Sequence, residues 1–131
     1  TLIDDSDLIE SDDQKEEIGR KLSELNRVSF ASAHEAFCDF YKVDLSDLWP
    51  VTDASEGPSL SQIRNRLVHG EHFDQNHYDG LFDAREHLRW TLDRMILRVL
   101  EWPTEKSRVS KTYLPLLTSY MHWKESREKL R

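Results

Sequence analysis

The amino-acid sequence predicts an all-α protein, an antiparallel bundle of four to five helices. Apolar residues recur at spacings of three and four over most of the chain, and alternating runs of β-branched residues are absent. Glycine and proline, which interrupt helices, occur only four times each. The 131 residues, 37% of them hydrophobic, suit one domain with a single core. We expect residues 1–10 to be an acidic lead-in and residues 11–131 to form the helical domain.

The first half of the chain predicts one long helix, or two nearly continuous ones, followed by a loop. Ser11 and Gln14 have the spacing of a capping box, and helical periodicity continues over residues 12–42. We expect the segment after it to pack a short turn onto the core through its apolar side chains, Leu45, Leu48 and Trp49. Residues 52–58 are rich in turn formers and predict a loop.

The second half predicts three further helices. Ser59 and Gln62 form a second capping-box pattern, which starts a helix over residues 60–69, and Gly70 stands at its C-terminal cap. The apolar face of this helix is expected to hold Leu60, Ile63, Leu67 and Val68. A long helix over residues 78–101 is expected to end before Pro103 and to bury the stripe of Leu81, Ala84, Leu88, Leu92, Met95 and Val99. A last helix is expected to begin near Leu114, with Pro115 in its first turn.

Composition excludes several classes of protein. The longest apolar runs are three residues long, so no segment can form a membrane span, which needs about 20 residues. No basic and then apolar leader opens the chain, so we expect no secretory signal. Cys38 is the only cysteine, which excludes a disulfide scaffold and suits a reducing cytoplasm.

The formal net charge of −7 at first argues against a nucleic-acid partner, because phosphate binding needs positive charge. Its distribution changes that conclusion. Residues 1–17 carry eight acidic side chains and one basic one, which accounts for the whole deficit. The rest of the chain is balanced, so the net charge does not exclude RNA.

One stretch carries a candidate motif, Ser61-Gln62-Ile63-Arg64-Asn65-Arg66-Leu67-Val68-His69-Gly70. Arg64, a polar Asn65, and then His69 followed by Gly70 close a capped short helix between two long ones. This arrangement resembles the motif of the HEPN superfamily, the nucleotide-binding helical domains of higher eukaryotes and prokaryotes. Within it the chain looks most like the ApeA-like group, whose HEPN domain ends a longer anti-phage protein.

The resemblance implies a metal-independent endoribonuclease that acts as a homodimer in antiviral defence or as a toxin. Arg64 and His69 of both copies would form one composite cleft for RNA, with Asn65 in support. An N-terminal sensor domain would precede this chain in the full-length protein. His69 could serve as general acid or base, and Arg64 could hold a phosphate whose charge grows in the transition state. In one HEPN toxin group a modified Tyr lies two residues after the motif His; here that residue is Glu71, which puts that regulation in doubt.

Helix geometry qualifies the pair. At 100° per residue, Arg64 and His69 lie about 140° apart around the helix axis, whereas Asn65 and His69 share a face. Both motif side chains could instead cap carbonyls or pair with acids, as arginine and histidine at helix ends often do.

Four other residues are weaker candidates for RNA binding. Arg66 and His72 also fit a loose Arg-to-His spacing, although a solvated Arg66 is the simpler interpretation. Arg85 and Arg89 flank the apolar stripe of the long helix and could hold phosphates or simply face solvent. His69, His72 and His77 lack the spacing of a structural metal site, so we expect neither a metal nor a cofactor.

Two other functions remain open. The chain could be a catalytically inactive HEPN module for dimerisation or for binding a nucleotide or protein. It could also be an unrelated helical interaction domain, in which Arg64 and His69 would lie far from any cleft or interface.

Overall fold

The computed structural model describes residues 11–131, apart from the side chains of Ser11 and residues 23–29. The chain divides into two compact units, Thr1–Ala36 and Phe37–Arg131, and each is described by itself. All regular structure among the described residues is helical, which confirms the all-α prediction. The acidic lead-in and the side chain of the predicted Ser11 cap lie outside the described residues.

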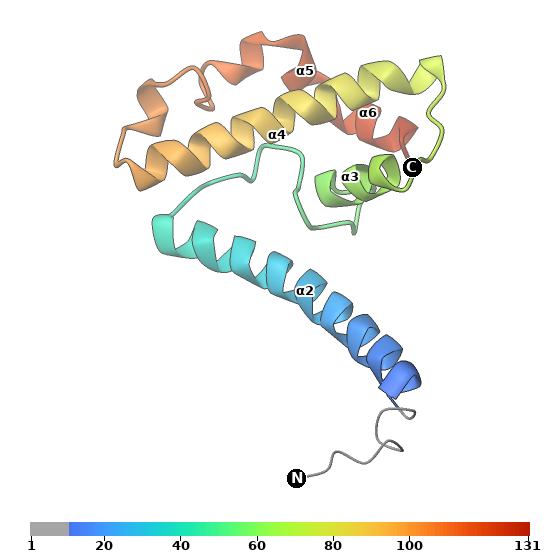
Figure 1. The fold of residues 1–131 in the computed structure, drawn as a ribbon. Helices are drawn as coiled ribbons and strands as arrows, with labels where there is room; N and C mark the ends of the chain where they lie inside the picture. Colours follow the sequence, from blue (N-terminus) through green and yellow to red (C-terminus); the bar gives the residue numbers. More distant parts are fainter. Residues whose placement is uncertain (1–10) are drawn as a thin grey trace. The chain divides into compact units, whose positions relative to one another are not determined.

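Helix α2 (Ser11–Tyr41) is one continuous helix (blue to teal in Figure 1), which excludes the alternative of two nearly continuous ones. Asp12 and Asp13 occupy its first turn, where the positive end of the helix dipole favours negative charge. Ile18 and Leu22 are exposed within the first unit. The helix ends at Tyr41, because the next residue, Lys42, has a positive φ of 55°. The Val43 N–H donates to the carbonyl of Cys38 (2.9 Å).

The second unit consists of the end of α2, helix α3 (Leu60–Val68), helix α4 (Tyr78–Val99) and a returning C-terminal segment. Short 3-10 turns precede and follow α4, at Gln75–His77 and Thr104–Lys106. Helix α4 ends close to its predicted boundary, before Pro103.

The C-terminal segment runs antiparallel to α4 (Figure 1). Near the start of α4, the backbone of Gly80 lies against Leu130. In the middle of α4, His87 contacts the carbonyl of Ser119 (Nε2 to O, 3.0 Å). Near the end of α4, Arg94 Nε donates to the carbonyl of Val109 (2.7 Å). Later residues of α4 therefore contact earlier residues of the C-terminal segment, so the two run in opposite directions. This is the antiparallel packing that the sequence predicts.

The core of the second unit consists of two clusters of buried side chains, one around Trp49 and Trp123 and one around Trp90. Trp49 is 1% exposed, and its ring stacks on Trp123 at 6.0 Å between ring centres. Its indole N–H donates to the carbonyl of Pro58 (2.9 Å), which closes the loop over residues 49–58. A second cluster joins Trp90 with Leu48, Val109 and Leu114. The prediction that Leu48 and Trp49 pack onto the core is therefore confirmed.

The predicted buried stripe of α4 is only partly right: Ala84 is buried and Leu81 packs against the core, but three of its six residues are exposed. The face that packs inside the second unit is formed by Gly80, Ala84, His87, Trp90, Thr91 and Arg94. Of the predicted stripe only Ala84 is among them, while Leu88, Leu92 and Val99 are 41%, 48% and 45% exposed. Two polar side chains explain which face of α4 packs inside the unit. His87 and Arg94 bond to backbone carbonyls of the C-terminal segment, so the face that carries them turns toward that segment.

The predicted last helix is broken into three pieces. A 3-10 turn (Leu114–Leu116), helix α5 (Thr118–Met121) and helix α6 (Trp123–Lys129) follow one another. Leu117 is extended, with ψ of 137°, and separates the first two pieces. Pro115, which lacks an N–H donor, lies in the first of them. The breaks let Leu114, Trp123 and Leu130 all reach the core.

No helix among residues 11–131 has both the length and the low charge that crossing a membrane would require.

Candidate functional site

The motif lies on α3, and local interactions define both ends of this helix. The Ser59 hydroxyl accepts from the Gln62 N–H (3.2 Å), and the Gln62 side chain accepts in return from the Ser59 N–H. This is the capping box that the sequence predicts. At the other end, the Gly70 N–H donates to Leu67 O and the Glu71 N–H to Arg66 O, which forms a Schellman motif. Gly70 has the positive φ, 74°, that this motif requires.

Leu60 and Ile63 are the buried residues of α3. The other two residues of the predicted apolar face, Leu67 and Val68, are exposed, so only the first half of this face packs inside the unit. The reason is the length of the helix: its last turn extends beyond the Trp49 and Trp123 cluster that Leu60 and Ile63 contact. The motif residues in that turn therefore lie at the surface.

Arg64 and His69 are both exposed. The Arg64 guanidinium donates to Asn65 Oδ1 (3.2 Å), and the His69 N–H donates to the carbonyl of Asn65 (2.9 Å). Asn65 thus contacts both motif residues, through its side chain and its backbone. Five positions along a helix correspond to about 140° around its axis, so the chain presents Arg64 and His69 in different directions.

Arg66 is not a solvated arginine. Its guanidinium forms a two-point ion pair with Glu71 and also donates to the carbonyl of Leu130. It lies 4.9 Å from the centre of the Phe73 ring. The hydrogen bonds from Arg66 hold the pKa of Glu71 below its ordinary value. Arg66 therefore joins the end of α3, the turn after it and the end of α6.

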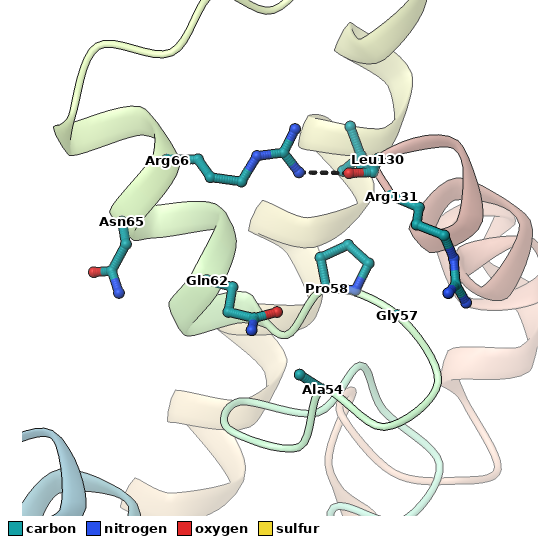
Figure 2. Close-up of a pocket in the computed structure, with 8 residues that line it drawn as sticks. All are labelled: Ala54, Gly57, Pro58, Gln62, Asn65, Arg66, Leu130 and Arg131. Carbon is teal, nitrogen blue, oxygen red and sulfur yellow. Dashed lines mark hydrogen bonds between the residues drawn. The ribbon is translucent and has the colours of Figure 1, made fainter.

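A hollow of about 520 Å³ lies beside α3, and Arg66 forms part of its wall (Figure 2). Its lining comes from three parts of the chain: the loop of Ala54, Gly57 and Pro58, the α3 residues Gln62, Asn65 and Arg66, and the C-terminal Leu130 and Arg131. The polar lining is rich in N–H donors, namely two amides and two guanidinium groups. Both guanidinium groups are already engaged, Arg66 by Glu71 and the carbonyl of Leu130, and Arg131 by Glu128 and the carbonyl of Glu56. The amide N–H groups of Gln62 and Asn65 are therefore the donors left for a ligand, and they suit an acceptor such as a carbonyl or phosphate oxygen.

The hollow brings together some of the predicted site residues and leaves others out. Asn65 and Arg66 line it, and Arg64 and His69 do not. By helical position, however, His69 lies on the same side of α3 as Gln62 and Asn65.

The remaining candidates lie elsewhere on the surface. His72, Arg85 and Arg89 are exposed, and none of them lines the hollow. Arg89 lies 3.9 Å from a carboxylate oxygen of Glu86, one turn earlier on α4. Arg85 and Arg89 lie on the exposed side of α4, among its exposed apolar residues.

His77, the last of the three histidines considered for a metal site, has structural contacts of its own. His77 Nδ1 accepts from the Asp74 N–H (3.1 Å) and its ring packs edge-on against Phe73. Among residues 11–131, no group of three or more His, Cys, Asp or Glu side chains is arranged to hold a metal ion.

Sequence reasoning missed Gln62 and Arg131 as lining residues and Glu71 as the ion-pair partner of Arg66. The sequence does contain a signal for two of them. A capping-box Gln lies at the start of its helix, which places Gln62 beside the preceding loop. A charged residue just after a Schellman motif lies near the last helical turn, which places Glu71 near Arg66. Arg131 lies 65 residues after Arg66, and no local pattern connects the two.

Comparison with known proteins found no match: no family model, no curated protein and no solved structure is similar to this chain.

Proposed function

We propose that this chain is a HEPN-like endoribonuclease domain that cleaves RNA as a homodimer, without a metal. The observation that carries the proposal is the Arg64-Asn65…His69-Gly70 motif at the exposed end of a capped helix. The side chains of Arg64 and His69 are accessible, and neither makes a contact with a described acidic residue that would explain it structurally. Both are therefore available to a substrate or to a second copy of the chain.

The chemistry follows from the residue types. His69 would take the proton of a ribose 2′-hydroxyl, or give one to the leaving oxygen, because imidazole titrates near neutral pH. Arg64 would hold the phosphate while negative charge grows on its oxygens. The attack of the 2′-hydroxyl would leave a 2′,3′-cyclic phosphate and requires no metal ion.

The angle between the two motif residues supports a composite site. One α3 helix presents Arg64 and His69 on different faces, so one copy alone would bring both to a phosphate only with difficulty. Two copies related by a two-fold axis would supply an Arg64 and a His69 to the same cleft. Asn65 would orient both, since it already contacts Arg64 through its amide oxygen.

The proposal includes the setting that the resemblance implies. The domain would be the C-terminal effector of a longer cytoplasmic defence or toxin protein, with a sensor domain before it. The amide groups of Gln62 and Asn65, which line the hollow, would contact the RNA backbone as it leaves the cleft. Arg85, Arg89 and His72 would add contacts to phosphates.

The test is cleavage of a single-stranded RNA in EDTA by the wild type, Arg64→Ala and His69→Ala. We expect each variant to lose about 10²–10⁴-fold in rate, the usual contribution of general acid–base and charge-stabilising groups. The matched controls are Arg108→Ala and His122→Ala, which remove an exposed Arg and an exposed His elsewhere and should leave the rate unchanged. Equal rates for all five proteins, or loss of wild-type activity in EDTA, would contradict the mechanism.

A second function is favoured by the apolar side of α4. Leu88, Leu92 and Ile96 are 41%, 48% and 55% exposed on one helix, and clustered exposed apolar residues are typical of an interaction surface. The domain could then be a catalytically inactive module for dimerisation or for binding a nucleotide or protein. It would form a stable dimer that cleaves no RNA, and motif variants would change only binding or assembly.

A further inference from the structure

A second cavity lies in the unit Phe37–Arg131, and it shares no residue with the hollow beside α3. It has a volume of about 280 Å³ and lies between the segment that follows α2, the C-terminal half of α4 and the loop over residues 104–112. Four basic side chains line it: Lys42, Arg94, Arg98 and Lys111. Two acidic side chains, Asp44 and Glu105, also line it.

Two of the four basic side chains are already paired. Arg94 forms a two-point ion pair with Asp47, with Nη2 to Oδ2 at 2.9 Å, and is 2% exposed. Lys111 contacts the carboxylate of Asp44. The hydrogen bond from Lys111, aided by Ser46, holds the pKa of Asp44 well below its ordinary value. These two pairs form walls of the cavity and leave no net charge.

Arg98 and Lys42 are different. Arg98 Nε donates to the carbonyl of Tyr41 (2.9 Å), which fixes the position of its guanidinium. Its two terminal nitrogens bond to no residue among those described. Lys42 forms no ion pair with any described residue and is held at the rim by its left-handed backbone. One of the lining carboxylates, Glu105, likewise has no basic partner in residues 11–131, so the cavity keeps one net positive charge.

Hydroxyl groups complete the lining. Thr104, Ser110 and Thr112 all line the cavity. The Thr104 hydroxyl is buried and has no hydrogen-bond partner among the described residues. A buried polar group without a partner is rare in folded proteins and is commonly satisfied by a ligand or a bound water.

We propose that this cavity binds the phosphate monoester group of a small molecule. A phosphate monoester carries close to two negative charges at neutral pH and offers three acceptor oxygens. The free nitrogens of Arg98 provide a planar pair of donors for two of these oxygens, and Lys42 provides a second positive charge. The volume lies just below the range of about 300–1,000 Å³ for small-molecule sites, which suits a phosphate with at most a sugar-sized group beside it. The site uses no motif residue of α3 and does not depend on the proposed ribonuclease activity.

The test is titration of the isotope-labelled chain with inorganic phosphate and with adenosine 5′-monophosphate at constant ionic strength, followed by NMR. We expect saturable shifts of the Arg98 Nε–H signal and of the backbone signals over residues 104–112. Adenosine, which lacks the phosphate, should give no such shifts.

Three variants test the charges. Arg98→Gln should raise the Kd for adenosine 5′-monophosphate by at least about tenfold, the usual effect of losing a charge-assisted contact. Glu105→Gln should lower the Kd, because it removes the one unpaired negative charge of the lining. Lys106→Gln removes an exposed lysine of the same loop that does not line the cavity and should leave the Kd unchanged.

Several results would overturn the proposal. One is the absence of saturable shifts with either phosphate compound. Another is an equal loss of affinity in Arg98→Gln and Lys106→Gln, which would indicate general attraction to positive charge. A third is equal affinity for an RNA oligonucleotide that carries only phosphodiesters, because the site would then not select a monoester. The NMR spectrum of each variant also shows whether it is folded.

Discussion

Two buried arginines carry much of the polar organisation of the second unit. Arg94 contacts the Asp47 carboxylate and the carbonyls of Asp44 and Val109, so it connects α4 to the chain on both sides. Arg127 is 4% exposed, and its guanidinium donates to the carbonyls of Asp53, Gly57 and Pro58. Burying a charge is costly unless hydrogen bonds replace its water, and here backbone carbonyls do so.

Asp47 shows the balance of forces in this arrangement. Burial acts to raise the pKa of Asp47, but the hydrogen bonds from Arg94 and Tyr120 outweigh it. The pKa therefore lies below its ordinary value, and the carboxylate stays charged in the fold.

His87 is the residue with the clearest expected pH dependence. It is fully buried, its Nδ1 accepts from the Trp49 N–H (3.0 Å), and its Nε2 therefore carries the proton and donates to Ser119 O. Burial lowers the pKa of His87 from 6.5 to about 4. The hydrogen bond to the Ser119 carbonyl acts in the opposite direction, as do Asp83 and Asp47, and these effects only reduce the shift.

The direction in which stability changes with pH depends on whether the folded or the unfolded chain binds the proton at the higher pH. As the pH falls below about 6.5, the unfolded chain binds a proton at His87 and the folded chain does not. This contribution to the free energy of unfolding is complete above pH 6.5 and should fall by about 3 kcal/mol as the pH reaches 4. Urea denaturation between pH 4.5 and 7.5 measures it. His87→Gln, although less stable, should show a shallower slope, and an unchanged slope would assign the effect to another group.

At the scale of elements, caps and turns set the boundaries of the helices more than propensity does. Ser59 and Gln62 start α3, and Gly70 ends it. The loop before α3 depends on a different glycine. Gly57 has φ of 143°, and a Cβ there would lie 3.2 Å from Arg127 Nε.

We expect Gly57→Ala to destabilise the chain by about 2–3 kcal/mol, because it adds backbone strain and disturbs the bonds from Arg127. Gly70→Ala is the matched control. Gly70 also has a positive φ, but no atom lies within 4 Å of the added methyl, so a cost of about 1 kcal/mol is expected from strain alone. Chemical denaturation of both variants measures the difference, and equal costs would mean that the Arg127 contact adds nothing.

At the scale of the whole molecule, the exposed apolar side of α4 is the main feature that the second unit leaves unexplained. A homodimer, as proposed above, gives this surface a role. Leu92→Glu places a charge in its middle and should shift a dimer toward monomer by at least about tenfold in Kd, because an apolar contact is replaced by a buried charge.

Sedimentation equilibrium of the wild type and the variant measures this shift. Lys129→Glu, on the exposed end of α6, is the control and should leave the association constant unchanged. A wild type that is monomeric at every concentration would remove the homodimer. If Leu92→Glu is monomeric but no longer unfolds cooperatively, the substitution has disturbed the fold of the single chain. This side of α4 would then be buried within one chain and not between two copies.

The sequence by itself determined the all-helical class and most helix boundaries. Apolar spacing, the Ser59 and Gln62 box, Gly70 and Pro103 are local features, and local features act over one or two turns. They predicted α2, α3 and α4 to within about two residues, which is the usual spread of helix ends.

Only the tertiary structure decided which face of α4 packs, where the last helix breaks and what surrounds the motif. His87 and Arg94 lie on the packed face because carbonyls of the return segment, 32 and 15 residues later, accept their hydrogen bonds. Arg66 is held by a carbonyl 64 residues away. These contacts join distant parts of the chain, and no periodicity in a single helix encodes them. The candidate residues of the motif were visible in the sequence, while the hollow beside them and the second cavity exist only once the chain has folded.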